Sequence, residues 1–261
     1  MSATFSTEDV QILNEVMAGQ RPEEIVAWAV ARFGGGLTLA SSFGAEDMVV
    51  LDLLLAADPQ ARVFLLDTGR LPQETYDVIE AARQRYGRDF EVFVPNTQAL
   101  EALLRQQGPN GFYASKDNRK GCCHVRKVEP LARALSGAQA WLTGLRRSQS
   151  FTRTLLPFAE VDEGHGGILK LNPLAAWSEE QVWATIRERD LPYNALHDKG
   201  YPSIGCAPCT RAILPGEEVR AGRWWWEEPE HKECGLHPRA GAGALPAAQL
   251  ANEAVSEAVP S

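Results

Sequence analysis

Short apolar runs alternate along the first 145 residues with longer stretches in which apolar positions recur every three or four residues. The runs predict buried strands at residues 37–40, 62–66, 90–94 and 140–143. The periodic stretches predict helices at residues 45–57, 73–86, 99–106 and 123–135. Strands that alternate with helices of this length are typical of right-handed βαβ units. We therefore expect an α/β fold with a mainly parallel sheet flanked by helices.

Beyond Leu145 the alternation of apolar runs and periodic stretches is less regular. One more strand is predicted at Ile168–Leu171, and Ser178 followed by Gln181 predicts a helix that opens with a capping box. Residues 197–237 are rich in Gly, Pro, Cys and Trp and show little periodicity, which indicates an irregular C-terminal segment shaped by its ligands. We expect a single domain over residues 1–239 and a disordered tail over residues 240–261, where Ala, Gly, Pro and Glu dominate.

Composition narrows the class of protein. The 261 residues are 44% hydrophobic and 23% charged, which is typical of a globular protein rather than a disordered one. The formal net charge of -8 argues against a general nucleic-acid binder. No apolar run approaches the length of a membrane helix, and the N-terminus lacks the pattern of a signal peptide. We therefore expect a cytoplasmic protein with neither nucleic acid nor membrane as partner.

Four of the five cysteines form two close pairs, Cys122-Cys123 and Cys206-Ala-Pro-Cys209. Disulfides are disfavoured in a reducing compartment, whereas four thiolates suit an iron–sulfur cluster or a zinc ion. Adjacent cysteines fit poorly on one small ion, so the pattern favours iron–sulfur over structural zinc, with buried, unliganded thiols as the third interpretation. Lys127 follows Cys123 by four residues, so on a helix it would share a face with it and offset the thiolate charge, the alternative being an ordinary solvated lysine on the helix surface.

Two turns at predicted strand ends carry small polar residues. The first lies between a strand and a helix, where backbone N–H groups and the helix dipole favour an anion, and reads Ser41-Ser42-Phe43-Gly44. It matches neither of the two common glycine-rich phosphate loops. The second turn ends the next strand and reads Asp67-Thr68-Gly69. Ligands of open parallel sheets lie beyond the carboxyl ends of the strands, so the two turns predict a nucleotide cradle, with ordinary β–α turns as the alternative.

Cationic side chains and one further cysteine occupy the second half of the chain. The arginine fork suits the oxygens of phosphate and sulfate, and the candidates are Arg146, Arg147, Arg153, Arg220, Arg223 and, as a further cation, His237. Cys234 is left over from the two cysteine pairs and has Lys and His neighbours that lower a thiol pKa. It is a candidate nucleophile, the alternative being an incidental surface cysteine.

Taken together, these motifs resemble the assimilatory adenylyl-sulfate (APS) reductases and their relatives, the 3′-phosphoadenylyl-sulfate (PAPS) reductases. The resemblance spans about residues 35–238 and includes Leu-Asp-Thr-Gly at 66–69 and Lys-Glu-Cys-Gly-Leu-His at 232–237. It implies an adenine-nucleotide α-hydrolase-like fold of the PP-loop type, in which residues 41–44 form a modified pyrophosphate loop. It also implies a [4Fe-4S] cluster on the four paired cysteines. The family nucleophile falls on Cys234, within a catalytic segment at about residues 228–238, and the substrate-binding basic residues fall on Lys127, Arg153, Arg220, Arg223 and His237.

The activity that this resemblance implies is thioredoxin-dependent reduction of APS to sulfite and AMP through an S-sulfocysteine, as a step of assimilatory sulfate reduction. The reductant, thioredoxin or glutaredoxin, must be external, because the one C-x-x-C of the chain belongs to the predicted cluster. The nearest alternative is a PAPS or dual reductase, although the PAPS-specific relatives lack the two cysteine pairs.

Two more distant alternatives remain. One is a zinc module without activity. The other is an ATP-pyrophosphatase that adenylates its substrate, and the Ser-Ser-Phe-Gly loop argues against it. The sequence leaves open whether the chain forms a homo-oligomer.

Overall fold

The computed structural model describes residues 5–150, 153–228 and 236. These residues form one six-stranded sheet in the order β3-β2-β1-β4-β6-β5. All neighbouring strands pair in parallel except β5 and β6, which are antiparallel. The strands are β1 (Leu37–Ala40), β2 (Arg62–Leu66), β3 (Glu91–Phe93), β4 (Ala140–Leu142), β5 (Ala159–Asp162) and β6 (Ile168–Leu171). The expected mainly parallel α/β sheet is confirmed.

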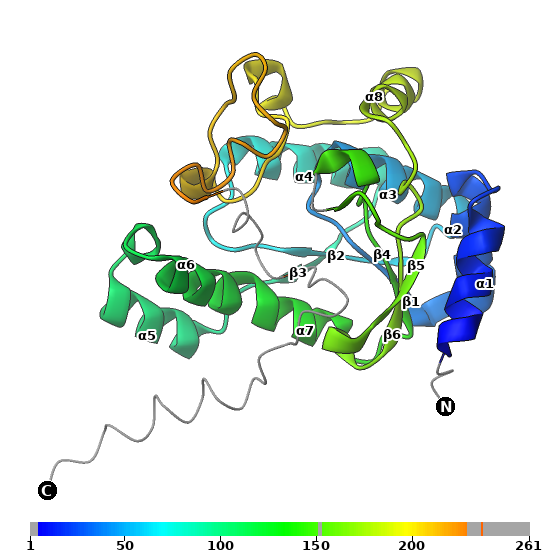
Figure 1. The fold of residues 1–261 in the computed structure, drawn as a ribbon, viewed down its shortest axis with the longest axis horizontal. Coiled ribbons are helices and arrows are strands. Elements are labelled where there is room, and N and C mark those ends of the chain that lie inside the picture. The colour runs from blue at the N-terminus through cyan, green and yellow to red at the C-terminus, as the bar shows by residue number, and fades with distance from the viewer. Residues whose placement is uncertain (1–4, 151–152, 229–235, 237–261) are drawn as a thin grey trace, which may run out of the picture.

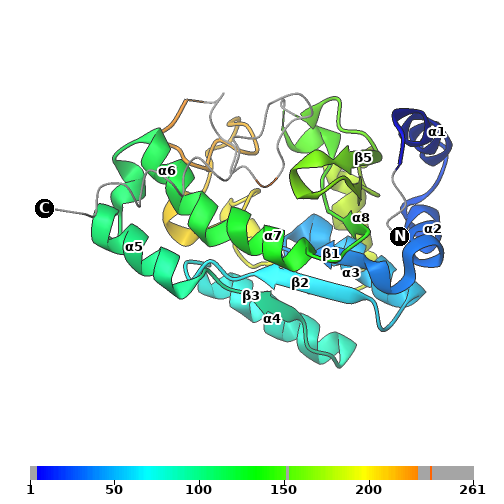
Figure 2. The same cartoon turned by 90° about the horizontal axis from the view of Figure 1, so that it is seen from below.

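Helices cover both faces of this sheet. Figures 1 and 2 agree in showing α4 and α7 on opposite faces of the central strands, while α1 and α2 lie beside the β5 end. The helices are α1 (Thr7–Met17), α2 (Pro22–Phe33), α3 (Ala45–Ala57), α4 (Gln73–Tyr86), α5 (Thr97–Gln107), α6 (Lys116–Cys123), α7 (Glu129–Leu135) and α8 (Glu179–Glu188). Among the described residues, none of the helices combines the length and apolarity that a membrane span requires.

The buried side chains form a separate layer on each face of the sheet. The larger layer centres on α3, whose apolar residues face the sheet, α2 and α8 and include Val50, Leu51 and Leu54, all fully buried. The smaller layer lies under α7 and joins Leu131 to Phe64 and Trp141. Both faces of the sheet are thus covered by packed side chains. The carboxyl ends of β1, β2 and β4 therefore meet at one edge, where a ligand has access.

Local sequence explains most element boundaries. The helices at Ala45–Ala57 and Gln73–Tyr86 begin and end as predicted. Ser178 caps α8 in the predicted capping box, accepting a hydrogen bond from the Gln181 N–H at 3.3 Å. The helix predicted over residues 123–135 is only the second half of a longer one, which begins at Lys116 and passes through a π-helical turn, His124–Val128. Such turns often occur at functional sites.

Candidate active site

A cavity of about 240 Å³ opens at the carboxyl ends of β1, β2 and β4. It brings together the predicted residues Ser41, Ser42, Phe43, Gly44, Thr68, Lys127, Arg153, Arg220 and Arg223. Two other members of the predicted cradle, Asp67 and Gly69, do not line it. The predicted anion loop and the cations from distant parts of the chain therefore share one site.

The loop of residues 41–44 is held by its own side chains. The hydroxyl of Ser41 accepts a hydrogen bond from the Phe43 N–H at 3.1 Å, which closes a tight turn. Phe43 has a φ of 56°, a left-handed conformation that is uncommon for a bulky residue. Its ring is buried and packs edge-to-face on Phe90 with centroids 5.2 Å apart. Packing of the ring thus stabilises a strained backbone directly before the first turn of α3.

Asp47 joins this loop to the end of β4. One carboxylate oxygen accepts hydrogen bonds from the N–H and the hydroxyl of Ser42, both at 2.6 Å, and the other accepts one from the Gly144 N–H at 3.1 Å. The approach is so close that a Cβ on Gly144 would collide with the carboxylate. Burial raises the Asp47 pKa to about 6 although these hydrogen bonds oppose the change.

Hydrogen bonds and backbone geometry explain the residues found in the turn at the end of β2. The Asp67 carboxylate accepts hydrogen bonds from the Gly69 N–H at 2.8 Å and the Tyr76 hydroxyl at 2.9 Å. Gly69 has a φ of 67°, which favours glycine. The Thr68 carbonyl accepts a hydrogen bond from Arg126. Asp67 and Gly69 therefore shape the turn, and Thr68 is the member that reaches the cavity.

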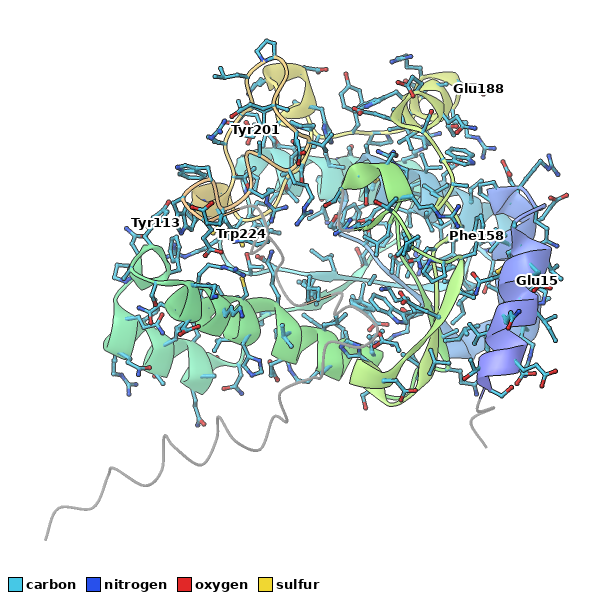
Figure 3. The ribbon with its side chains drawn as sticks, in the orientation of Figure 1. Glu15, Tyr113, Phe158, Glu188, Tyr201 and Trp224 are labelled. Carbon is cyan, nitrogen blue, oxygen red and sulfur yellow. The ribbon has the colours of Figure 1, made fainter. Side chains whose placement is uncertain are left out.

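The four paired cysteines gather beside this cavity. Cys122 and Cys123 end α6, and Cys206 and Cys209 flank a short 3-10 turn, so the pairs come from segments more than 80 residues apart. All four line a second cavity of about 20 Å³. Figure 3 places Tyr113 and Trp224 at this end of the molecule. The Tyr113 hydroxyl donates to the Pro208 carbonyl at 2.6 Å, which ties the turn to the segment before α6.

Positive charge surrounds the four thiols. Arg70, Arg119, Arg126, Lys127 and Arg223 line the same cavity. Burial would raise the pKa of Cys206, but Lys127, a hydrogen bond with Thr68 and nearby arginines bring that pKa below its ordinary value. Burial and the neighbouring thiols Cys206 and Cys123 raise the pKa of Cys209 to about 12. The thiols are thus close enough to influence one another's ionisation.

The donor set fits an iron–sulfur cluster chemically. Soft thiolates are its usual ligands, and Phe112 and Trp224 belong to the same buried cluster as Cys123, Cys206 and Cys209. In the part of the chain that the structure describes, no three His, Cys, Asp or Glu side chains are arranged to hold a single metal ion. The cluster assignment stays a prediction.

The remaining predicted cations differ in their surroundings. Arg146 is buried and forms an ion pair with Glu46 at 2.7 Å, so its charge is already balanced. Arg147 donates to the Leu156 carbonyl at 2.8 Å. Arg153 lines the cavity and donates at 2.6 Å to Gln149. Arg223 is 6% exposed and donates to the Ile204 carbonyl at 3.2 Å.

The predicted nucleophile Cys234 and the predicted substrate-binding residue His237 lie outside the described residues, as does the predicted tail. Leu236, between them in sequence, is described and lines the large cavity. It packs against the apolar layer that contains Leu131 and Trp141.

Sequence reasoning missed several residues of the site. Asp47 reads as an ordinary acidic residue in the first turn of a helix, and only its contact with Gly144, 97 positions away, distinguishes it. His197 also lines the cavity but is a single histidine without a motif. Arg119 is one of many arginines, and its burial against Glu227 cannot be read from spacing.

One family model, one relative and two solved structures are similar to this chain. The phosphoadenosine phosphosulfate reductase domain model matches residues 36–212. An adenosine 5′-phosphosulfate reductase from Allochromatium vinosum is 53% identical over 86% of this chain and 87% of its own length. A solved PAPS reductase from Candida auris, 31% identical, superposes with a TM-score of 0.69 over 82% of this chain and 100% of its own. Yeast FAD synthetase, 13% identical, superposes with a TM-score of 0.53 over 80% of this chain and 70% of its own, which supports the fold alone.

The mainly parallel six-stranded sheet flanked by helices is an α/β fold of the PP-loop type. The predicted fold class is therefore confirmed. The chain belongs to the phosphoadenosine phosphosulfate reductase family.

Proposed function

We propose that this chain reduces APS to sulfite and AMP, with Cys234 as nucleophile, a [4Fe-4S] cluster on Cys122, Cys123, Cys206 and Cys209, and a thioredoxin-type dithiol as reductant. Support for APS comes from the 53% identical relative, which is named an adenosine 5′-phosphosulfate reductase.

The observation that carries this proposal is that the two cavities share cations. Lys127 and Arg223 line both the large cavity and the smaller one between the cysteines. Arg220 and Arg153 line the large cavity as well. A nucleotide whose phosphate and sulfate point toward this end would meet cations that suit its oxygens. The loop at Ser41–Gly44 adds an anion-binding turn at the start of α3.

The first chemical step is a displacement at sulfur. The Cys234 thiolate attacks the sulfate sulfur of APS, an S–S bond forms, and the S–O bond to AMP breaks. AMP leaves with the electron pair of that bond, and its new negative charge is stabilised by the cations of the cavity. Leu236 lines the cavity only two residues after Cys234 in sequence, which supports a nucleophile from this segment.

The second step releases sulfite. One thiolate of the reductant attacks the Cys234 sulfur, sulfite leaves with the electron pair of the S–S bond, and a mixed disulfide forms. The second thiol of the reductant then attacks that disulfide, which regenerates the Cys234 thiolate and oxidises the reductant. The two electrons that sulfate accepts therefore come from the external dithiol.

The cluster takes no part in these bond changes. When bound, it supplies a fixed centre of charge beside Lys127 and Arg223, the two cations that also line the substrate cavity. The π-helical turn at His124–Val128 carries Lys127 and follows Cys123 directly, so the position of this lysine depends on the same backbone that holds two of the thiols. Lys127 would then orient substrate oxygens relative to Cys234.

Use of PAPS is the second candidate, since the solved Candida auris relative is described as a PAPS reductase. The cytoplasmic location, the choice between thioredoxin and glutaredoxin, and homo-oligomer formation stay predictions.

Sulfite release tests the proposal. Purified enzyme is incubated with thioredoxin, its reductase and either APS or PAPS, and sulfite is measured over time. We expect thioredoxin-dependent sulfite from APS at a higher kcat/KM than from PAPS. Equal or faster turnover of PAPS would contradict the substrate assignment, and sulfite formation without added dithiol would contradict the source of electrons.

A further inference from the structure

The side-chain amide of Gln149 joins one cation of the large cavity to the end of β4. Gln149 ends a 3-10 turn (Arg147–Gln149) that follows this strand, and both Gln149 and Arg153 line the cavity. The Arg153 guanidinium donates a hydrogen bond to Gln149 Oε1 at 2.6 Å, and Gln149 Nε2 donates to the Gly144 carbonyl at 3.3 Å. Gly144 lines the same cavity. The amide therefore holds the guanidinium beside the strand end at which the cavity opens.

An amide is the side chain that satisfies all three partners of Gln149. Its Oε1 also accepts a hydrogen bond from the backbone N–H of Arg146 at 3.1 Å. The two arginine groups can only donate, whereas the Gly144 carbonyl can only accept. An ionised carboxylate of the same length could serve both donors but could not donate to the carbonyl, and a hydrocarbon side chain could do neither. These partners thus determine which end of the amide faces Arg153.

The hydrogen bonds continue from Gly144 to the loop at residues 41–44. The Gly144 N–H donates to one carboxylate oxygen of Asp47 at 3.1 Å. The other oxygen accepts from the N–H and the hydroxyl of Ser42, both at 2.6 Å. A chain of hydrogen bonds between cavity-lining residues therefore runs from Ser42 to Arg153. It fixes the cation relative to the anion-binding turn before a ligand arrives, which reduces the entropy lost on binding.

The backbone of Arg153 is held by the same part of the chain. Its N–H donates to the Ser150 carbonyl at 2.9 Å, and its carbonyl accepts from the Leu156 N–H at 2.8 Å. The Leu156 carbonyl in turn accepts a hydrogen bond from Arg147 Nε at 2.8 Å. With the backbone fixed, the remaining freedom lies in the long arginine side chain, whose rotamers the contact with Gln149 restricts.

The neutral charge of Gln149 matters for an anionic ligand. The neighbouring Arg146 is paired with the Glu46 carboxylate at 2.7 Å, which balances its charge. The Gln149 amide, by contrast, orients the Arg153 guanidinium without adding a negative charge to the cavity. A phosphate or sulfate oxygen would therefore meet an oriented cation and no repulsion from the residue that orients it.

We propose that Gln149 is a positioning residue, whose amide orients Arg153 toward the oxyanions of the nucleotide. The inference rests on the proposed function in that it takes Arg153 as a residue that binds the phosphate or sulfate of the substrate.

A double-mutant cycle on ADP binding to the intact enzyme, measured by calorimetry, tests this inference. ADP carries a terminal phosphate in place of the sulfate of APS, so it offers two oxyanion groups without the reacting sulfur. Arg153→Ala should weaken ADP binding about ten- to a hundredfold, and Gln149→Met, which has a similar length but no amide, about three- to tenfold. In the Arg153→Ala background, Gln149→Met should change the Kd by less than about twofold, because no guanidinium remains to be oriented.

Ser148→Ala, an exposed change in the same 3-10 turn, is the matched control and should leave the Kd of ADP unchanged. Equal weakening by Gln149→Met in both backgrounds would overturn the inference, because Gln149 would then act on the ligand or on the turn without Arg153. Wild-type affinity in either single variant, or no binding of ADP to the wild type, would also overturn it. If Gln149→Met does not fold, Gln149→Ala takes its place. ADP binding needs no turnover, so inactivity toward APS would contradict the proposed function without deciding this test.

Discussion

Arg119 and Glu227 form a buried ion pair with an N–O distance of 2.7 Å, and their side chains are 1% and 7% exposed. Two hydrogen bonds, at 2.9 and 2.7 Å, make the contact bidentate. Arg119 lies on α6, four residues before Cys123, while Glu227 follows the tryptophans that pack beside Cys209. The pair therefore joins the two segments that bring the cysteine pairs together.

Removing one partner of this ion pair should destabilise the segments that carry the four cysteines. Glu227→Ala removes the carboxylate that pairs with the buried Arg119 guanidinium, and breaking a buried ion pair from one side typically costs about 3–5 kcal/mol of unfolding free energy. We expect a fall in stability of that order in urea unfolding, together with less iron per chain. Glu228→Ala, a change at the adjacent exposed position, is the control. Equal stability and iron content in the two variants would contradict the role of the pair.

The [4Fe-4S] assignment predicts how much iron and sulfide the purified protein contains. Protein purified without oxygen should contain about four iron and four acid-labile sulfide per chain, because four cysteines are the usual ligands of a [4Fe-4S] cluster. Cys206→Ala should lose most of both, whereas Cys234→Ser should keep them. Zinc without sulfide in the wild type would contradict the assignment and support the zinc module instead.

The raised pKa of Asp47 predicts that the free energy of unfolding depends on pH. Its pKa rises from 3.8 to about 6 on folding, so the native state binds this proton more tightly than the unfolded state. The stabilisation from protonated Asp47 is fully present below pH 4 and is lost as the pH rises through 6. Asp47 retains some exposure, so the change should stay below about 3 kcal/mol. Urea unfolding of wild type and Asp47→Asn should show a difference that favours wild type increasingly as the pH falls from 7 to 4. A difference that stays constant over this range would contradict the assigned pKa.

Arg223 should contribute to substrate binding and to packing. A hydrogen bond to a charged group is worth about 1.5–3 kcal/mol, so Arg223→Ala and Arg220→Ala should each lower kcat/KM for APS roughly ten- to a hundredfold. Arg223→Ala should also lower the melting temperature, since this side chain is buried against Trp224 at 4.7 Å. Arg105→Ala, on the exposed surface of α5, is the control. Unchanged kinetics in both site variants would remove these arginines from the site.

Much of the fold was predictable because apolar periodicity determines which faces are buried. The helix Ala45–Ala57 and the strand Arg62–Leu66 follow directly from that pattern. The antiparallel strand β5 (Ala159–Asp162) was not predicted, since only two of its four residues are buried and its polar residues resemble a loop. Its Glu160 pairs with Lys170 of β6 at 2.7 Å, a contact that no local pattern indicates.

The site was predictable where chemistry follows sequence spacing. The cysteine pairs and the loop at residues 41–44 have such spacing, and the structure brings each set together. Asp47 could not be assigned, because its role depends on a contact with Gly144 that only the folded chain creates. The same holds for Arg146, whose pairing with Glu46 separates it from the cations that are available to a substrate.

The central claim is that Cys234 carries the sulfonate group between the two steps, and the intact mass of the enzyme after incubation with APS alone tests it most directly. We expect the wild type to gain the mass of one SO₃ group, to lose it on addition of thioredoxin, and to show the adduct on Cys234 after peptide digestion. Cys234→Ser should gain no mass while keeping its iron. An adduct that forms equally on Cys234→Ser, or that maps to any other cysteine, would contradict the account.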